Sequence, residues 1–181
     1  AFDRGRALFE ADAAYLASGL DASAGSYPPR AGTARAQTDR FGGLHGIFAD
    51  SLPDSWGRLL LDRRAAKRGI AVSSITAFDR LSCVGDVGVG ALAYRPATAP
   101  EDVQAGDIDL QALGNDAMRI LDGEEAGSLM LLQRIGGSPG GARPKVLVGL
   151  DGNGRLAQGE GRLPAGYDPW IVKFRSHDDF H

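Results

Sequence analysis

Apolar residues recur at helical spacing in two long stretches of the chain. The first begins at Leu52, where Pro53 suits a first turn and Asp54 lies beside the positive end of the helix dipole. A basic last turn followed by Gly69 predicts where this helix ends. One face of it carries Leu52, Trp56, Leu59 and Leu60. We therefore expect Trp56 in the core and not as a platform for a ligand.

The second helical stretch runs from Asp109, a residue type that caps helices, to Gly123, a residue type that ends them. Its shared apolar face consists of Leu110, Leu113, Ala117 and Ile120. A shorter helix is expected over Ser74–Cys83. These helices account for most of the periodic apolar positions in the middle of the chain.

Short apolar segments separated by glycines predict strands. Residues 5–15 suggest strands joined by a turn near Asp12, and the polar, Pro-rich stretch 25–40 suggests a surface loop or hairpin. After the glycines at 85–90, the segment Ala91–Arg95 is expected to form another strand.

The last third of the chain is predicted to be rich in strands. Val146–Val148 and Leu156–Gln158 flank Asp151–Gly154, a strong turn sequence, which predicts a β-hairpin. A final apolar strand, Trp170–Phe174, carries Lys173 in its interior.

A change of composition divides the chain. Residues 96–106 combine Pro, Ala, Thr and acidic residues without apolar periodicity, which is typical of a linker. We therefore expect a β-rich domain over 1–105 and a second domain over 106–181. The fold class predicted is α+β.

Composition narrows the classes of function. No apolar run approaches the roughly 20 residues of a membrane span, and the start of the chain has neither a signal-peptide core nor an initiator Met. The single cysteine, Cys83, cannot form an intrachain disulfide, so a cytoplasmic location and an inert, packed thiol are expected. A net charge of −3 argues against a protein that coats nucleic acid. A local basic cluster could be a solvated helix face or a contact for nucleic acid or a partner: Arg58, Arg63, Arg64, Lys67 and Arg68.

The residues that are most informative about chemistry are a glycine-rich run, 136–142, and Lys173, which follows Gly141 by 32 positions. Glycines let backbone N–H groups approach a polyphosphate, and a lysine on a rigid strand can supply a fixed positive charge. Lys173 would be costly to bury in an apolar strand without an anion. An ordinary turn and a lysine that reaches solvent are the competing interpretation.

Other chemistry is excluded by spacing. A Walker-type loop needs Lys and Ser or Thr after its last glycine, whereas Ala142 follows Gly141 here. The glycines at 85–90 lack the spacing of a dinucleotide-binding fingerprint, and no nucleophile elbow is present. The sequence Asp178-Asp179-Phe180 lacks the glycine of a kinase Mg²⁺-binding motif. No metal site is expected, since the histidines do not form a ligand spacing with the lone cysteine; they are His45, His177 and His181.

Four stretches in this order resemble the HipA-like family of bacterial serine/threonine kinase toxins: Phe48–Arg58, Phe78–Leu92, Gly136–Lys145 and Trp170–Phe174. The resemblance covers nearly the whole chain. It implies a small β-rich subdomain followed by the start of a kinase-like N-lobe, with the C-lobe absent. It also implies that the catalytic and Mg²⁺-binding aspartates lie downstream of the lysine strand, so that this chain alone is inactive.

The resemblance further implies a nucleotide site. Lys173 would contact the ATP phosphates, and the loop over them would comprise Gly137, Ser138, Gly140, Gly141 and Ala142. Ser138 would be the regulatory autophosphorylation site, because a phosphate there would repel ATP from the loop. Pro139 restricts Ser138 to extended conformations, which limits how the loop can fold over ATP. Lys145 is a candidate support for the loop.

The leading hypothesis is therefore the amino-terminal part of an ATP- and Mg²⁺-dependent protein kinase of the toxin–antitoxin type. Its partners would be a helix-turn-helix antitoxin, an unidentified protein substrate, and DNA only indirectly through the antitoxin; no membrane is involved. The alternative is a stand-alone HipA-like module that docks or inhibits a separate kinase chain. A third reading is a degenerate relative whose loop no longer binds nucleotide.

Overall fold

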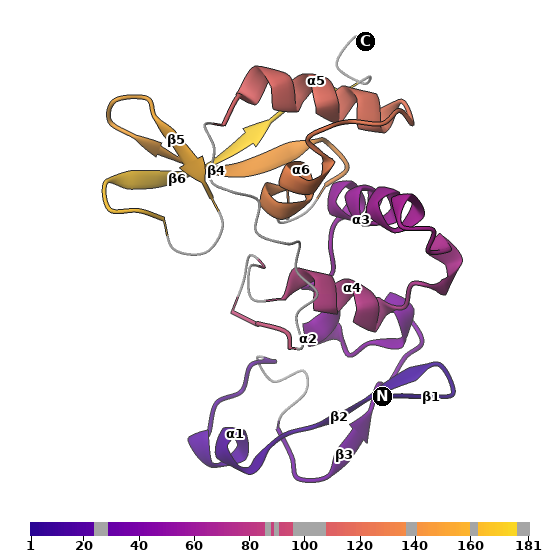
Figure 1. Ribbon diagram of the computed structural model, residues 1–181. Helices are drawn as coiled ribbons and strands as arrows, with labels where there is room; N and C mark the ends of the chain where they lie inside the picture. The colour runs from indigo at the N-terminus through magenta and orange to yellow at the C-terminus, as the bar shows by residue number, and fades with distance from the viewer. Residues whose placement is uncertain are drawn as a thin grey trace. The chain divides into compact units, whose positions relative to one another are not determined.

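The computed structural model describes residues 1–23, 29–85, 88, 91–95, 108–136, 141–159 and 163–176. These residues form helices and two three-stranded antiparallel sheets, which confirms the predicted α+β class (Figure 1). The chain divides into two compact units, Ala1–Leu52 and Pro53–His181. Each unit has its own sheet.

The sheet of the first unit has the order β1-β2-β3, formed by Phe2–Asp3, Arg6–Glu10 and Thr33–Arg35. Phe9 pairs with Ala34 in the antiparallel register between β2 and β3. The interior of this unit combines small side chains, Ala7, Ala34 and Ala36, with the larger buried side chains of Leu44 and His45. Part of the stretch 25–40 is therefore a strand paired with β2, while residues 24–28 lie outside the described part.

The expected second strand after Asp12 is wrong, because the chain forms the helix α1, Ala13–Ser18, at that point. The Asp12 carboxylate accepts a hydrogen bond of 2.7 Å from the backbone N–H of Tyr15. This contact caps a helix, and the two alanines that follow Asp12 favour helical backbone. The strands β1 and β2 are instead joined by a turn at Arg4–Gly5, and Asp12 is the N-cap of a helix.

The rest of the first unit is a 3₁₀ turn, η1, over Phe41–Gly43 and a short helix, α2, over Gly46–Ala49. His45 precedes α2 and is 5% exposed. Its ring packs against a pair of phenylalanines that also contact each other, with ring centroids 6.1 Å from Phe9 and 5.8 Å from Phe48. Burial lowers the pKa of His45 from its ordinary value of 6.5, although backbone hydrogen bonds to Ala7 and Ala34 partly oppose this.

The second unit opens with the helix predicted from Leu52 onward, observed as α3 over Ser55–Lys67. A 3₁₀ turn, η2, at Val72–Ser74 leads to α4 at Ala77–Val84, which confirms the shorter helix. Thr76 and Asp79 form a reciprocal capping box at the start of α4. The Thr76 hydrogen bonds are the main cause of a lowered pKa at Asp79.

The strand expected over Ala91–Arg95 is not formed. In this segment the Tyr94 N–H donates a hydrogen bond of 2.7 Å to the carbonyl of Gly85. A strand needs a ladder of such bonds to a neighbour, and this segment has none among the described residues. Apolar composition alone therefore did not predict the secondary structure of this segment.

Two further helices follow, α5 at Leu110–Leu121 and α6 at Leu129–Ile135. Asp109 caps α5 by accepting from the N–H groups of Gln111 and Ala112, as the sequence predicted. The Asp116 carboxylate accepts from Ser128 N–H at 2.8 Å and so joins the two helices. The sequence analysis did not predict α6.

The second sheet has the order β5-β4-β6, formed by Leu156–Gln158, Lys145–Asp151 and Tyr167–Lys173 (Figure 1). The hairpin between β4 and β5 confirms the prediction. Asp151 closes its turn by accepting from the N–H groups of Asn153 and Arg155, and the latter bond is the main cause of its lowered pKa. The final strand starts three residues earlier than expected, at Tyr167 rather than Trp170.

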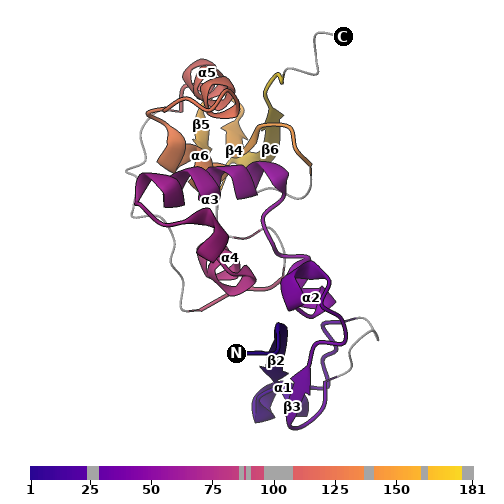
Figure 2. The same cartoon turned by 90° about the vertical axis from the view of Figure 1, so that its right-hand side faces the viewer.

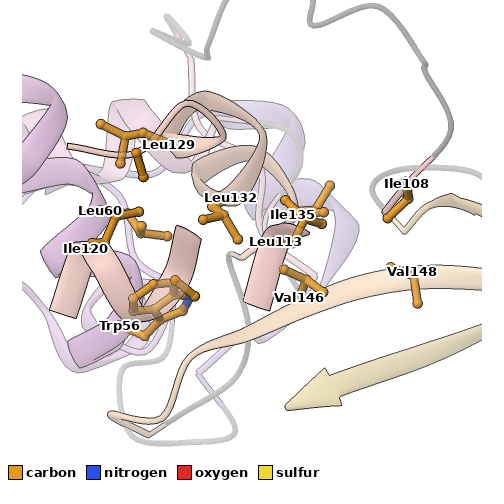
Figure 3. Close-up of a cluster of buried hydrophobic side chains, with 12 residues drawn as sticks. Trp56, Leu60, Ile108, Leu113, Ile120, Leu129, Leu132, Ile135, Val146 and Val148 are labelled. Carbon is orange, nitrogen blue, oxygen red and sulfur yellow. The ribbon is translucent and has the colours of Figure 1, made fainter. Parts of the chain in front are cut away.

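The core of the second unit lies between α3, α5, α6 and β4, with α3 alongside α6 (Figure 2). Figure 3 shows Trp56, Leu60, Leu132 and Val146 gathered into one cluster from α3, α6 and β4. Trp56 is 1% exposed, so its expected place in the core is confirmed. Each large side chain buried there contributes about 1.5–3 kcal/mol.

The predicted domain boundary near residue 105 falls within 96–107, which lie outside the described residues, so it stays a prediction. The division into compact units at 52/53 is a separate feature of the fold. Among the described residues, every helix is too short or too polar to cross a membrane.

Candidate functional site: a glycine-rich loop anchored on helix α3

The glycine-rich loop begins at Gly136, which is packed against α3. Gly136 ends α6, and a Cβ placed on it would overlap the Leu132 carbonyl oxygen. The same Cβ would lie 3.1 Å from Leu60 Cδ1 and 3.1 Å from Trp56 Nε1. Only glycine therefore fits between α6 and the first turns of α3 without displacing a neighbour.

The other end of the loop is held by Lys145, the first residue of β4. Its side chain is 3% exposed, and its Nζ donates to Asp54 Oδ2 at 2.7 Å and to the Gly141 carbonyl at 3.0 Å. Gly141 has a φ of +111°, a conformation that favours glycine. The ammonium group thus ties the last glycine of the loop to the start of α3.

Asp54 uses its two oxygens for different partners. Oδ1 caps α3 by accepting from Gly57 N–H at 2.7 Å, and Oδ2 takes the Lys145 ammonium. A side chain at Gly57 would come within 3.1 Å of Pro53 Cβ and 3.3 Å of that Oδ1. The sequence Pro53-Asp54-Ser55-Trp56-Gly57 is therefore suited to hold one carboxylate in one orientation.

Trp56 adds a second contact to the same lysine. Its indole Nε1 donates to the Lys145 backbone carbonyl at 3.1 Å, in a buried position. Asp54 therefore holds the side chain of Lys145 while Trp56 holds its backbone. Since Gly136 also packs on Trp56, both ends of the loop rest on the first two turns of α3.

The strand register places Lys173 beside this anchored end. Lys173 pairs directly with Lys145 between β6 and β4, and Phe174 N–H extends the ladder to the Pro144 carbonyl at 2.9 Å. Cα atoms paired in this way lie about 4.5–5.5 Å apart, with their side chains on the same face of the sheet. The lysine of the final strand and the end of the loop are thus neighbours, although the two lysines are 28 positions apart in the sequence.

The two lysines differ in environment. Two like charges directly opposite each other destabilise a sheet, but Asp54 neutralises Lys145. Lys173 is exposed and has no ion pair among the described residues. Of the two paired lysines, Lys145 is the buried one and Lys173 the exposed one, and its role in binding phosphate stays a prediction. The exposed ammonium of Lys173 is the group open to an anion.

The remaining predicted loop residues are only partly described. Gly137, Ser138 and Gly140 lie outside the described residues, and so does Pro139. Ala142 is exposed, next to Gly141. The structure thus brings Gly141, Ala142, Lys145 and Lys173 together at one end of the second sheet.

The basic cluster is only partly a solvated face. Arg64 is 8% exposed and its Nη1 donates to Gln133 Oε1 at 3.2 Å, while Arg63 donates to the Ile120 carbonyl at 3.4 Å. Arg58, Lys67 and Arg68 are exposed. Two of the five positive charges therefore hold α3 to α5 and α6.

The other candidate groups do not gather into a site. Cys83 is half-buried and lines a pocket of about 430 Å³ between α3 and α4, together with Leu61 and Ile75. No group of three or more His, Cys, Asp or Glu side chains within the described ranges could hold a metal ion.

Sequence reasoning missed the part that Asp54 and Trp56 play in holding the loop. It treated Asp54 as the start of a helix and Trp56 as core. The ion pair joins residues 91 positions apart, and nothing local in a single sequence predicts such a contact. The nearest signal was the presence of both segments, 48–58 and 136–145, among the stretches that carry the family resemblance.

Comparison with known proteins identifies a family for the amino-terminal half of the chain. The family model described as HipA N-terminal domain matches residues 1–95. This is more than half of the 181 residues, and the chain belongs to that family. No curated protein and no solved structure gives a match.

Proposed function

We propose that this chain supplies the nucleotide-gripping part of an ATP-dependent serine/threonine protein kinase of the toxin–antitoxin type. The observation that carries the proposal is the pairing of Lys173 with Lys145. It places an exposed lysine next to Gly141 and Ala142, at the end of a glycine-rich run of the kind that lets backbone N–H groups approach phosphate. Membership of the HipA N-terminal domain family also supports this proposal.

ATP would be held by the chain's own residues in two ways. Lys173 would neutralise charge on the phosphates, and the backbone of Gly137, Ser138, Gly140, Gly141 and Ala142 would donate hydrogen bonds to them. Bound ATP would supply the transferred phosphoryl group. Mg²⁺ would act in the complete protein, with carboxylate ligands outside the described residues of this chain.

Phosphorylation of Ser138 would regulate the site. The added charge of about −1.5 to −2 would repel the phosphates of ATP from the loop. A helix-turn-helix antitoxin would restrain the active kinase and carry the contact with DNA. The protein substrate is not assigned.

The experiment that tests this proposal is a phosphorylation assay on the full-length protein. Lys173→Ala should abolish autophosphorylation, because the ATP phosphates would lose the positive charge that Lys173 supplies. Autophosphorylation is detected as an increment of one phosphate in the intact mass. Lys67→Ala is the matched control, since it removes an exposed lysine from α3 and should leave the phosphate increment unchanged. Normal phosphorylation in the Lys173 variant would refute the assigned role.

One observation favours the alternative of a docking or inhibitory module. The family match ends at residue 95, so the glycine-rich loop and Lys173 lie beyond it. A module of this kind would bind a separate kinase chain and would show no heat of binding with ATP. Titrating the full-length protein with ATP and, separately, with the kinase chain distinguishes the two functions.

A further inference from the structure

Both ends of the glycine-rich loop rest on one short segment of the chain, 53–57. Gly136, at the start of the loop, packs on Trp56, and Lys145, which follows the loop, binds Asp54. The geometry points to Asp54 as a positioning residue that sets how the loop is presented to phosphate. This inference rests on the proposed nucleotide-binding function of the loop.

Asp54 reaches the loop through one lysine. Its Oδ2 holds Lys145 Nζ at 2.7 Å, and the same Nζ donates to the Gly141 carbonyl at 3.0 Å. The side chains of Asp54 and Lys145 are 6% and 3% exposed, so water does not compete for the pair. Without the carboxylate, a buried ammonium would have to find solvent or another anion, and the Gly141 carbonyl would lose its donor.

The same geometry assigns Lys145 a role different from that of Lys173. Lys145 is already neutralised and turned toward α3, so its charge supports the loop and does not bind phosphate. Lys173, paired with it across the strands, is the lysine left for the nucleotide. The two lysines thus divide the tasks of holding the loop and holding the ligand.

The contact also links two parts of the sequence. Asp54 lies inside the matched family segment, 1–95, and Lys145 lies outside it. Through this ion pair the family segment would influence the affinity of the loop for nucleotide, alongside the contacts that Trp56 makes with Gly136 and the Lys145 carbonyl.

The test compares three variants of the full-length protein. Asp54→Asn keeps an oxygen that can cap α3 but removes the charge. Asp54→Asn with Lys145→Met removes the pair without leaving a buried charge unpaired. Asp62→Asn is the matched control, because Asp62 also lies on α3 and forms an ion pair with Arg80 at 2.7 Å, with side chains 22% and 11% exposed.

Two quantities are measured for each variant: the dissociation constant for ATP by calorimetry, and backbone hydrogen exchange over residues 141–147. Asp54→Asn should weaken ATP binding by roughly tenfold, because a loop that is no longer held in its binding conformation must be ordered when ATP binds. It should also speed exchange over 141–147. The apparent KM for ATP should rise while kcat changes little, because the loop would grip ATP and the transition state alike.

The double variant separates positioning from simple stability. It should regain the thermal stability lost in Asp54→Asn and still bind ATP weakly, because the Gly141 carbonyl still lacks the ammonium that ties it to the start of α3. Recovery of wild-type affinity together with stability would overturn the inference. So would an equal loss of affinity in Asp62→Asn.

Failure of the proposed function gives a different pattern. If the wild-type protein neither binds ATP nor gains phosphate, the nucleotide function is refuted, and the exchange experiment still decides whether Asp54 holds the loop. Unchanged exchange over 141–147 in both Asp54 variants would overturn the positioning role by itself.

Discussion

Replacing Asp54 by Asn should destabilise the second unit far more than a surface substitution does. The change keeps the size of the side chain and an oxygen suited to cap α3. It removes the negative charge that lies 2.7 Å from Lys145 Nζ. The effect therefore comes from the ion pair and not from the helix cap.

The size of the effect follows from burial. Both side chains are almost completely buried, and removal of one partner from a buried ion pair costs about 3–5 kcal/mol. Asp54→Ala should add about 1 kcal/mol, because it also removes the cap on Gly57 N–H. A domain has about 5–15 kcal/mol of stability in total, so Asp54→Asn should fold and Asp54→Ala should be marginal.

Urea unfolding monitored by tryptophan fluorescence is a suitable assay, since the chain has two tryptophans, Trp56 and Trp170, and both lie in the second unit. The midpoint should fall while the slope m stays constant. Adding Lys145→Met should recover most of the loss, because no buried charge is then unpaired. A loss below about 1 kcal/mol for Asp54→Asn, the size seen for an exposed pair, would refute the reasoning.

Two further predictions test the start of the loop and the first unit. Gly136→Ala should destabilise the second unit by about 1–3 kcal/mol, because its Cβ meets Leu132, Leu60 and Trp56, whereas Gly152→Ala, with nothing within 4 Å, should change the urea midpoint little. Equal effects of the two alanines would argue against tight packing at Gly136. The pKa of His45 is lowered, so below its ordinary value of 6.5 the unfolded chain binds more protons, and the stability of the first unit should fall as pH drops. An NMR titration of the His45 ring checks this, and a midpoint at or above 6.5 would contradict it.

Elements with strong local signals were predictable from the sequence. Asp109 marked the start of α5, and the turn Asp151–Gly154 marked the hairpin of the second sheet. The helix predicted from Leu52 was found as α3, which begins at Ser55 because Asp54 is its N-cap. Each of these features depends on hydrogen bonds within a few residues. A single sequence contains the partners of such bonds side by side.

Features that depend on distant partners were not predictable. Ala91–Arg95 has strand composition but forms no ladder, and the apolar residues of α6 gain their stability from packing against α3, α5 and β4. The pairing of Lys145 with Asp54 needs the fold to bring two segments together. For the same reason the sequence pointed to Lys173 but could not tell which of the two lysines is buried.

Calorimetric titration of the full-length protein with ATP tests most directly whether this chain grips a nucleotide. Wild-type protein and the Lys67→Ala control should bind ATP with equal affinity, and Lys173→Ala should lose the heat of binding, because we propose that the exposed ammonium beside the loop is the main contact for the phosphates. Absence of binding to the wild-type protein, or equal binding by the Lys173 variant, would contradict this claim.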